Sequence, residues 1–129
     1  MADHLPRMSY VCRHIIVELN GCPSDALNDA QLLESMLFEA AQMVNTRVEA
    51  HITHHFQHQG VTCVAIVSAS HLSVHTWPES GYAGLDLMVY DSDFEICEVV
   101  NRLAERIGAT AVNYMEVRRG LISCGSVQR

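Results

Sequence analysis

The sequence predicts an α+β protein, a two-layer α/β sandwich whose mainly antiparallel sheet carries two helices on one face. Three observations favour this class. Six short segments are rich in β-branched residues or alternate apolar and polar residues, as strands do. Two longer segments repeat apolar residues at helical spacing along one face. The predicted order is β-α-β-β-β-β-α-β, and two such amphipathic helices can cover the same side of one sheet.

The first half of the chain predicts a strand, a helix and two more strands. Residues 11–19 form the first strand, and a turn follows at residues 21–24. Asn28 can cap the first helix. Residues 47–58 and 61–67 are the next two strands, with a turn at Gly60 between them. The apolar face of the helix comprises Leu33, Met36, Leu37, Ala40 and Val44.

The second half predicts two strands, a helix and a final strand. Residues 71–76 and 83–90 are the strands, joined by a turn-prone stretch of proline, glutamate, serine and glycine. Asp91 or Ser92 can cap the second helix, and Gly108 ends it. Residues 109–117 then form the last strand, and residues 120–129 are expected to be a loose tail. The buried helix face comprises Ile96, Val99, Val100, Leu103 and Ile107.

Composition narrows the class of protein. A chain of 129 residues, 49% of them hydrophobic, predicts a single domain over residues 1–129. No apolar run reaches the ~18–20 residues of a membrane span, and the first residues lack a signal peptide, so no membrane association is expected. Five cysteines without CxxC spacing predict reduced thiols and a cytoplasmic protein. A net charge of −7 with scattered arginines argues against nucleic-acid binding.

One segment in the middle of the chain carries the functional signal. Residues 68–79 read SASHLSVHTWPE and continue as SGYAGLDL, which places two histidines, the only tryptophan and an acid close together. This segment closely resembles the self-cleavage segment of the small bacterial and archaeal S-adenosylmethionine decarboxylases. The resemblance covers roughly residues 13–120. It implies a two-layer α+β fold and a pyruvoyl cofactor that the chain makes from its own Ser70.

The resemblance implies how the cofactor forms. The Ser70 hydroxyl would attack the carbonyl of Ala69, and the resulting ester would eliminate, leaving residues 1–69 and a second chain with a pyruvoyl group at position 70. The acyl shift is uphill and calls for a strained peptide. His75 matches the processing histidine and is expected to act as the base. Thr62 stands where the family commonly has a serine that assists. Strand alternation puts Ser70 and His75 on opposite faces, so a bend or bulge between them is expected.

The implied turnover condenses the substrate amine with the pyruvoyl carbonyl in a Schiff base. The chain has no lysine, which excludes a lysine-based Schiff base and fits a backbone-derived carbonyl. Tyr90 occupies the position of the family cysteine that returns a proton to the substrate. Tyrosine can donate a proton, but it is larger and titrates near ~10. Ala69 also departs from the family, which usually has glutamate there.

The substrate-binding residues are likewise implied by the resemblance. Phe56 matches one of two aromatic residues that sandwich the adenine. Leu19 occupies the place of the other, so one stacking face is lost. Glu79 matches the glutamate that binds the ribose hydroxyls, and Glu18 also matches the family.

The histidines of residues 51–58 do not predict a metal site. Zinc sites need three or four converging ligands, whereas a strand places His54 and His58 on one face and His55 on the other. We therefore expect no metal, and histidines that face solvent or substrate.

The sequence therefore predicts a pyruvoyl-dependent S-adenosylmethionine decarboxylase that serves the biosynthesis of spermidine and other polyamines. The enzyme is expected to be a homodimer of cleaved protomers. A closely related alternative is an ornithine or arginine decarboxylase with the same pyruvoyl chemistry. The loss of an aromatic and the bulk of Tyr90 favour a smaller substrate, whereas Phe56 and Glu79 favour the nucleoside. A second alternative is an uncleaved, inactive regulatory homologue.

Overall fold

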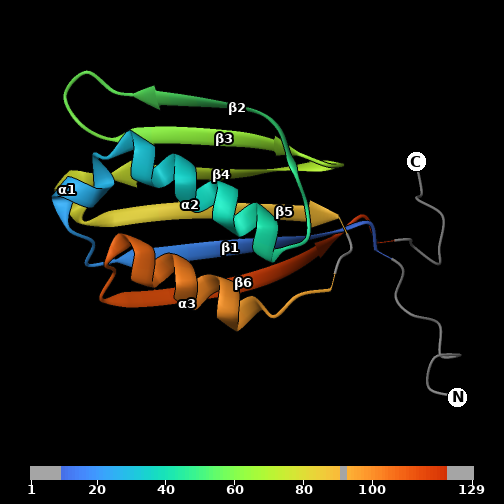
Figure 1. Cartoon of the computed structure of the whole chain (residues 1–129). Helices are drawn as coiled ribbons and strands as arrows, with labels where there is room; N and C mark the ends of the chain where they lie inside the picture. The colour runs from blue at the N-terminus through green and yellow to red at the C-terminus, as the bar shows by residue number, and fades with distance from the viewer. Residues whose placement is uncertain (1–9, 91–92, 122–129) are drawn as a thin grey trace, which may run out of the picture.

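A computed structural model of the chain describes residues 10–90 and 93–121 (Figure 1). One six-stranded antiparallel sheet runs in the order β2-β3-β4-β5-β1-β6. Its strands are β1 (Cys12–Asn20), β2 (Val48–His55), β3 (Val61–Val67), β4 (Ser70–Trp77), β5 (Tyr82–Tyr90) and β6 (Ala111–Arg119). The predicted class and element order are confirmed.

Two long helices lie side by side across one face of this sheet, α2 (Ala30–Met43) and α3 (Ile96–Ile107), as Figure 1 shows. A short helix, α1 (Ser24–Leu27), precedes α2, and a single 3-10 turn, η2 (Pro78–Ser80), joins β4 to β5. The 3-10 turn falls in the predicted turn at residues 78–81, whereas α1 was not predicted and begins at the last residue of the predicted turn at residues 21–24. No helix of the described residues is long and apolar enough to cross a membrane.

The first long helix is capped one residue later than predicted. Asp29 is the N-cap, and its side chain accepts a hydrogen bond from the Leu32 amide at 3.0 Å. The Asn28 side chain instead accepts from the Gly60 amide at 2.8 Å, which ties the β2–β3 loop to the start of α2. Neighbouring Asn and Asp are both good caps, and this tertiary contact decides between them.

The second long helix begins later than its predicted caps. Asp91 and Ser92 lie outside the described residues, and Glu95 holds the N-cap position without a side-chain hydrogen bond. The helix ends as predicted at Gly108, whose φ of 80° is the left-handed conformation that glycine adopts without strain.

The core lies between the helices and the sheet face that they cover. Alternate residues of the central strands, such as Ile15, Val17 and Leu19 in β1, are fully buried against the helices. On the same face, Arg13 donates to Glu116 at 2.7 and 3.1 Å and lies over the ring of Phe94. This ion pair fastens β1 to β6.

The opposite sheet face carries neither helix, and we call it the open face (Figure 1). Strand alternation directs a second set of residues onto it. Several of these are large, apolar and exposed: Ile52, Ile66, Trp77, Tyr90, Met115 and Val117. Large apolar side chains exposed on one face of a sheet are typical of an interaction surface.

Candidate functional site

The predicted site residues fall at the two ends of β4. This strand starts at Ser70 and pairs without interruption with β3 up to His75. It also pairs with β5 from His71 to Trp77. We call its two extremes the Ser70 end, with Ala69, Ser70 and Tyr90, and the His75 end, with His75 and the residues around it.

At the His75 end, Thr62 and His75 are direct cross-strand partners on the open face. The Thr62 hydroxyl lies at hydrogen-bonding distance from Nδ1 of His75. In the tautomer in which Nδ1–H donates to this hydroxyl, Nε2 carries the lone pair and is free to accept a proton. In that tautomer Thr62 orients the imidazole and leaves Nε2 available as a base.

Aromatic rings surround this imidazole. The centroid of the His75 ring lies 4.1 Å from that of Trp77 and 5.9 Å from that of Phe56. A hollow of about 460 Å³ opens beside them, within the range of small-molecule sites. It is lined by Phe56, Gln57, His58, Gln59, His75, Thr76, Trp77 and Glu79. Aromatic faces, amides and one carboxylate together fit a planar base with a polyhydroxylated substituent.

Glu18 reaches the His75 end through Tyr82. The Tyr82 hydroxyl donates to Glu18 Oε2 at 2.5 Å, and its ring stacks on Trp77 with centroids 5.3 Å apart. Burial and then the Glu18 carboxylate raise the pKa of Tyr82 to about 12, so the phenol stays protonated. A Cβ at Gly84 would lie 2.8 Å from this hydroxyl, which explains why glycine stands there. Tyr82 thus links the Glu18 carboxylate to the wall of the hollow.

The Ser70 end differs because its notable feature is backbone conformation. Residues 68 and 69 form a two-residue loop between the paired Val67 and Ser70. Ala69 has a φ of 68°, and Asn45 is the other non-glycine residue with a positive φ in the described part of the chain. The left-handed region costs an alanine about 1–2 kcal/mol. The strained residue thus immediately precedes Ser70, where sequence analysis called for a strained peptide.

Tyr90 is the last residue of β5, and it lies at the Ser70 end. The register pairs Met88 with His71, so Tyr90 is two residues beyond that pair and Ser70 one residue before it. The Tyr90 side chain is on the open face and more than half exposed. Strand alternation directs the Ser70 side chain to the helix-covered face, the side of Leu72 and Val74.

Ser70 and His75 are not brought together within one protomer. The expected bend or bulge between them is missing, because β4 keeps a continuous register with β3 from Ser70 to His75. Five residues of regular strand span about 16 Å. The base and the serine that it is expected to serve therefore lie at opposite ends of one strand and on opposite faces.

Leu19 does not line the hollow. It is fully buried in the core, on the helix-covered face, whereas its neighbour Glu18 is on the open face. Strand alternation allows one of two adjacent residues to reach the open face, so the prediction for Leu19 as a substrate contact is wrong.

The histidines of β2 each have separate partners. His51 pairs with Glu34 at 3.1 Å, and His55 lies 3.0 Å from the Asn28 carbonyl oxygen. Within residues 10–90 and 93–121, no group of three histidines, cysteines or acids converges as metal ligands would. The four cysteines in that part of the chain, Cys12, Cys22, Cys63 and Cys97, are free thiols.

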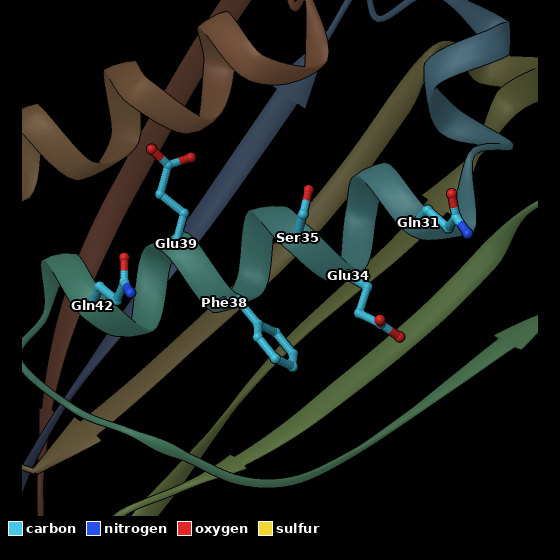
Figure 2. A pocket seen from close by; sticks show the side chains of 6 residues that line it. All are labelled: Gln31, Glu34, Ser35, Phe38, Glu39 and Gln42. Atoms are coloured by element: carbon cyan, nitrogen blue, oxygen red, sulfur yellow. The ribbon is translucent and has the colours of Figure 1, made fainter.

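A second hollow, of about 410 Å³, lies on α2, on the helix-covered side of the sheet (Figure 2). All the side chains that line it come from this one helix: Gln31, Glu34, Ser35, Phe38, Glu39 and Gln42. Both of its carboxylates already have partners. Glu34 contacts His51 and Thr53. Glu39 contacts Arg102 and Arg106. The hydrogen bond from Arg102, together with that from Arg106, holds the pKa of Glu39 below its usual value. These carboxylates fasten helices and strands together.

Trp77 and Tyr82 had no predicted role, although Trp77 lines the hollow and the Tyr82 ring stacks on Trp77. Two signals could have found them. Trp77 is two residues after His75 and therefore shares its face. Tyr82 is the cross-strand partner of Trp77, on the other side of the short turn formed by residues 78–81.

Known proteins match the part of the chain that contains these site residues. The family model described as S-adenosylmethionine decarboxylase matches residues 13–120. A relative from Pelotomaculum thermopropionicum, an S-adenosylmethionine decarboxylase proenzyme, is 36% identical over 89% of this chain and 91% of its own length. A proenzyme of the same name from Methanococcus maripaludis is 36% identical over 94% of this chain and 99% of its own.

A solved structure agrees with the fold. The crystal structure of the adenosylmethionine decarboxylase from Aquifex aeolicus superposes with a TM-score of 0.79 at 24% identity. It covers 93% of this chain and 99% of its own. The family match spans β1 to β6 and includes both ends of β4, and with the two proenzyme relatives it establishes that this chain belongs to the S-adenosylmethionine decarboxylase family.

Proposed function

We propose that this chain is a proenzyme that cuts itself between Ala69 and Ser70 and then decarboxylates S-adenosylmethionine for polyamine synthesis. The observation that carries the proposal is the left-handed Ala69 immediately before a serine, in a chain that belongs to this family. The hollow beside Phe56, Trp77 and Glu79 supports a nucleoside substrate.

Processing begins with the Ser70 hydroxyl. Its oxygen bonds to the Ala69 carbonyl carbon, the peptide C–N bond breaks, and the hydroxyl proton ends on the Ser70 nitrogen. A base then removes the Ser70 Cα proton, the Ala69 carboxylate leaves, and hydrolysis releases ammonia. The residues fit the pyruvoyl group because Ser70 is at the end of a hairpin, where a new chain terminus can form without removing a strand from the sheet.

The base comes from a second copy of the chain in this proposal. His75 lies about 16 Å along the strand from Ser70 in its own protomer. Two open faces can pack on each other with a two-fold axis that runs across the strands. That axis reverses β4 and places the His75 end of one protomer over the Ser70 end of the other. The exposed apolar residues of the open face, Ile66 and Met115 among them, support a homodimer of this kind.

The two ends then have separate tasks in turnover. The pyruvoyl group would supply an electron sink for the electron pair that stays on the substrate when carbon dioxide leaves. Phe56 and Trp77 hold the adenine by stacking, and Glu79 accepts hydrogen bonds from the ribose hydroxyls. Tyr90, at the Ser70 end, donates the proton that returns to the substrate.

The relatives favour S-adenosylmethionine over the alternatives. Both compared proenzymes carry the S-adenosylmethionine decarboxylase name, so ornithine, arginine and an uncleaved regulatory role are not favoured. The free thiols of the described residues fit the reducing cytoplasm, where we place this biosynthetic step.

Intact mass of the purified chain tests the proposal, with Ser70→Ala as the matched control. Wild type should give two fragments, 1–69 and 70–129 with a pyruvoyl end, and the variant one chain. Carbon dioxide release is then measured on S-adenosylmethionine, ornithine and arginine in parallel. An intact wild-type chain after long incubation at neutral pH, or release from ornithine or arginine alone, would contradict it.

A further inference from the structure

The loop that contains the predicted cut is attached to the edge strand β2 at two points. The Ser68 amide donates to the Arg47 carbonyl at 3.1 Å, and the Ser68 hydroxyl donates to Glu49 Oε2 at 3.2 Å. Both contacts hold the residue immediately before Ala69. The loop is therefore fixed from outside its own hairpin.

Glu49 reaches this loop because β2 is irregular there. Val48 pairs with Val67 and Ala50 with Ile66, so Glu49 is an extra residue in β2, a β-bulge. A bulge redirects a side chain that regular pairing would place elsewhere. The Arg47 guanidinium lies 3.5 Å from the same Glu49 oxygen and restrains the carboxylate in turn.

Backbone strain accelerates a reaction only if it cannot relax by another route. A free two-residue loop could return Ala69 to a negative φ by rotating Ser68. Holding Ser68 at its amide and its hydroxyl blocks that rotation. When the C–N bond of the Ala69–Ser70 peptide breaks and the ester forms, the chain path gains one bond and the strain is released.

We propose that the bulge at Glu49 is a clamp on the self-cleaving loop, which makes Glu49 a positioning residue for processing. With the Arg47 carbonyl it fixes Ser68, so that Ala69 stays in the strained conformation from which the Ser70 hydroxyl attacks. The clamp rests on the proposed cut between Ala69 and Ser70. It acts on the rate of the acyl shift and contributes no atom to the reaction.

The first test measures processing of full-length variants after pulse-labelled cell-free synthesis, as loss of intact chain with time. Glu49→Ala and Ser68→Ala should each slow cleavage by about 3- to 10-fold, as expected for one hydrogen bond. The double variant should be no slower than either single one, because both remove the same contact. Glu49→Gln keeps an acceptor oxygen and should retain most of the rate, and Glu105→Ala on α3 is the matched control for a lost surface charge.

A second test addresses the strain itself. Ala69→Gly relieves it and should slow cleavage by roughly tenfold, which corresponds to about 1.4 kcal/mol. In the uncleavable Ser70→Ala background the same change should raise the melting temperature. Additive effects of Glu49→Ala and Ser68→Ala, a Glu49→Gln variant as slow as Glu49→Ala, or Ala69→Gly cleaving at the wild-type rate would overturn the clamp. A wild type that never cleaves would instead overturn the proposed function, and the clamp with it.

Discussion

The two ends of β4 are built in different ways. At the His75 end, side chains hold one another: Thr62 orients His75, Tyr82 stacks on Trp77 and donates to Glu18. At the Ser70 end, the side chain of Tyr90 is exposed, and the backbone of Ala69 carries the distinctive geometry. Under the proposed function, substrate binding and the processing base would depend on packed side chains, and cleavage of the peptide would depend on backbone strain.

The largest expected effect tests whether the two ends meet between protomers. Ser70→Ala and His75→Ala should each abolish or strongly slow processing, the latter by about 10²–10⁴-fold because a general base is lost. Co-expression of both variants with different tags should restore cleavage only in the His75→Ala chain, because its Ser70 end would lie against the His75 end of a partner that keeps the histidine. Mass spectrometry of each tagged chain reads this out.

Two outcomes of that experiment would contradict the proposal that the two ends of β4 meet between protomers. Without cleavage of either chain in proven heterodimers, the base acts within one protomer. Full-rate cleavage of His75→Ala alone would assign the base to another residue. Size-exclusion chromatography with light scattering establishes that heterodimers are present.

Tyr90→Phe should separate turnover from processing. Both fragments should still form, because Tyr90 has no part in the acyl shift, while kcat falls by about 10²–10⁴-fold with the loss of a proton donor. Steady-state decarboxylation per mole of cleaved chain measures this. Unchanged kcat on every substrate would show that tyrosine is only a wall of the site and that another residue donates the proton.

Trp77→Ala should weaken binding at the His75 end. Loss of the stacking face should raise KM for S-adenosylmethionine by about tenfold, close to 1.4 kcal/mol, with little change in the fragments formed. Trp77→Phe, which keeps an aromatic face, is the control and should recover most of the affinity. Equal KM values for all three proteins would show that the adenine does not stack on the Trp77 ring.

Glu116→Gln probes the helix-covered face, where neither end should be affected. Its hydrogen bond from Arg13 lowers the pKa of Glu116, so the charged form stabilises the fold at neutral pH and this contribution is lost as pH falls through the lowered pKa. The variant should lose about 1–2 kcal/mol of unfolding free energy at pH 7. The loss should shrink as pH falls through this lowered pKa, because the wild-type carboxyl is then protonated too.

Denaturant unfolding at pH 7 and pH 3 measures this difference in the Ser70→Ala background. Glu105→Gln on α3, an exposed carboxylate 3.9 Å from Arg102, is the control and should change stability little. A loss for Glu116→Gln that does not depend on pH would indicate packing instead of charge.

Sequence alone predicted the layers and the element order well, because the apolar residues that repeat at helical spacing or alternate along strands are the ones that the fold buries. It also placed Thr62 and His75 on neighbouring strands. The parity of Ser70 and His75 was visible in the sequence, but the expected bend was not found, because hydrogen-bonding register depends on both neighbouring strands. The clamp at Glu49 was invisible for a similar reason, since a bulge is defined only by the partner strand.

Cleavage at the β3–β4 hairpin would have an unusual effect on the sheet. One fragment would keep β1, β2 and β3 and the other β4, β5 and β6. In the order β2-β3-β4-β5-β1-β6, β1 of the first fragment lies between β5 and β6 of the second. The borders β3–β4, β5–β1 and β1–β6 would each join different fragments, so neither fragment could keep the sheet by itself. Once separated, the halves would have to find each other by diffusion, so heat denaturation of the mature enzyme should be far less reversible than that of its precursor. The working lifetime of the mature protein would then be governed by how slowly its interleaved halves come apart.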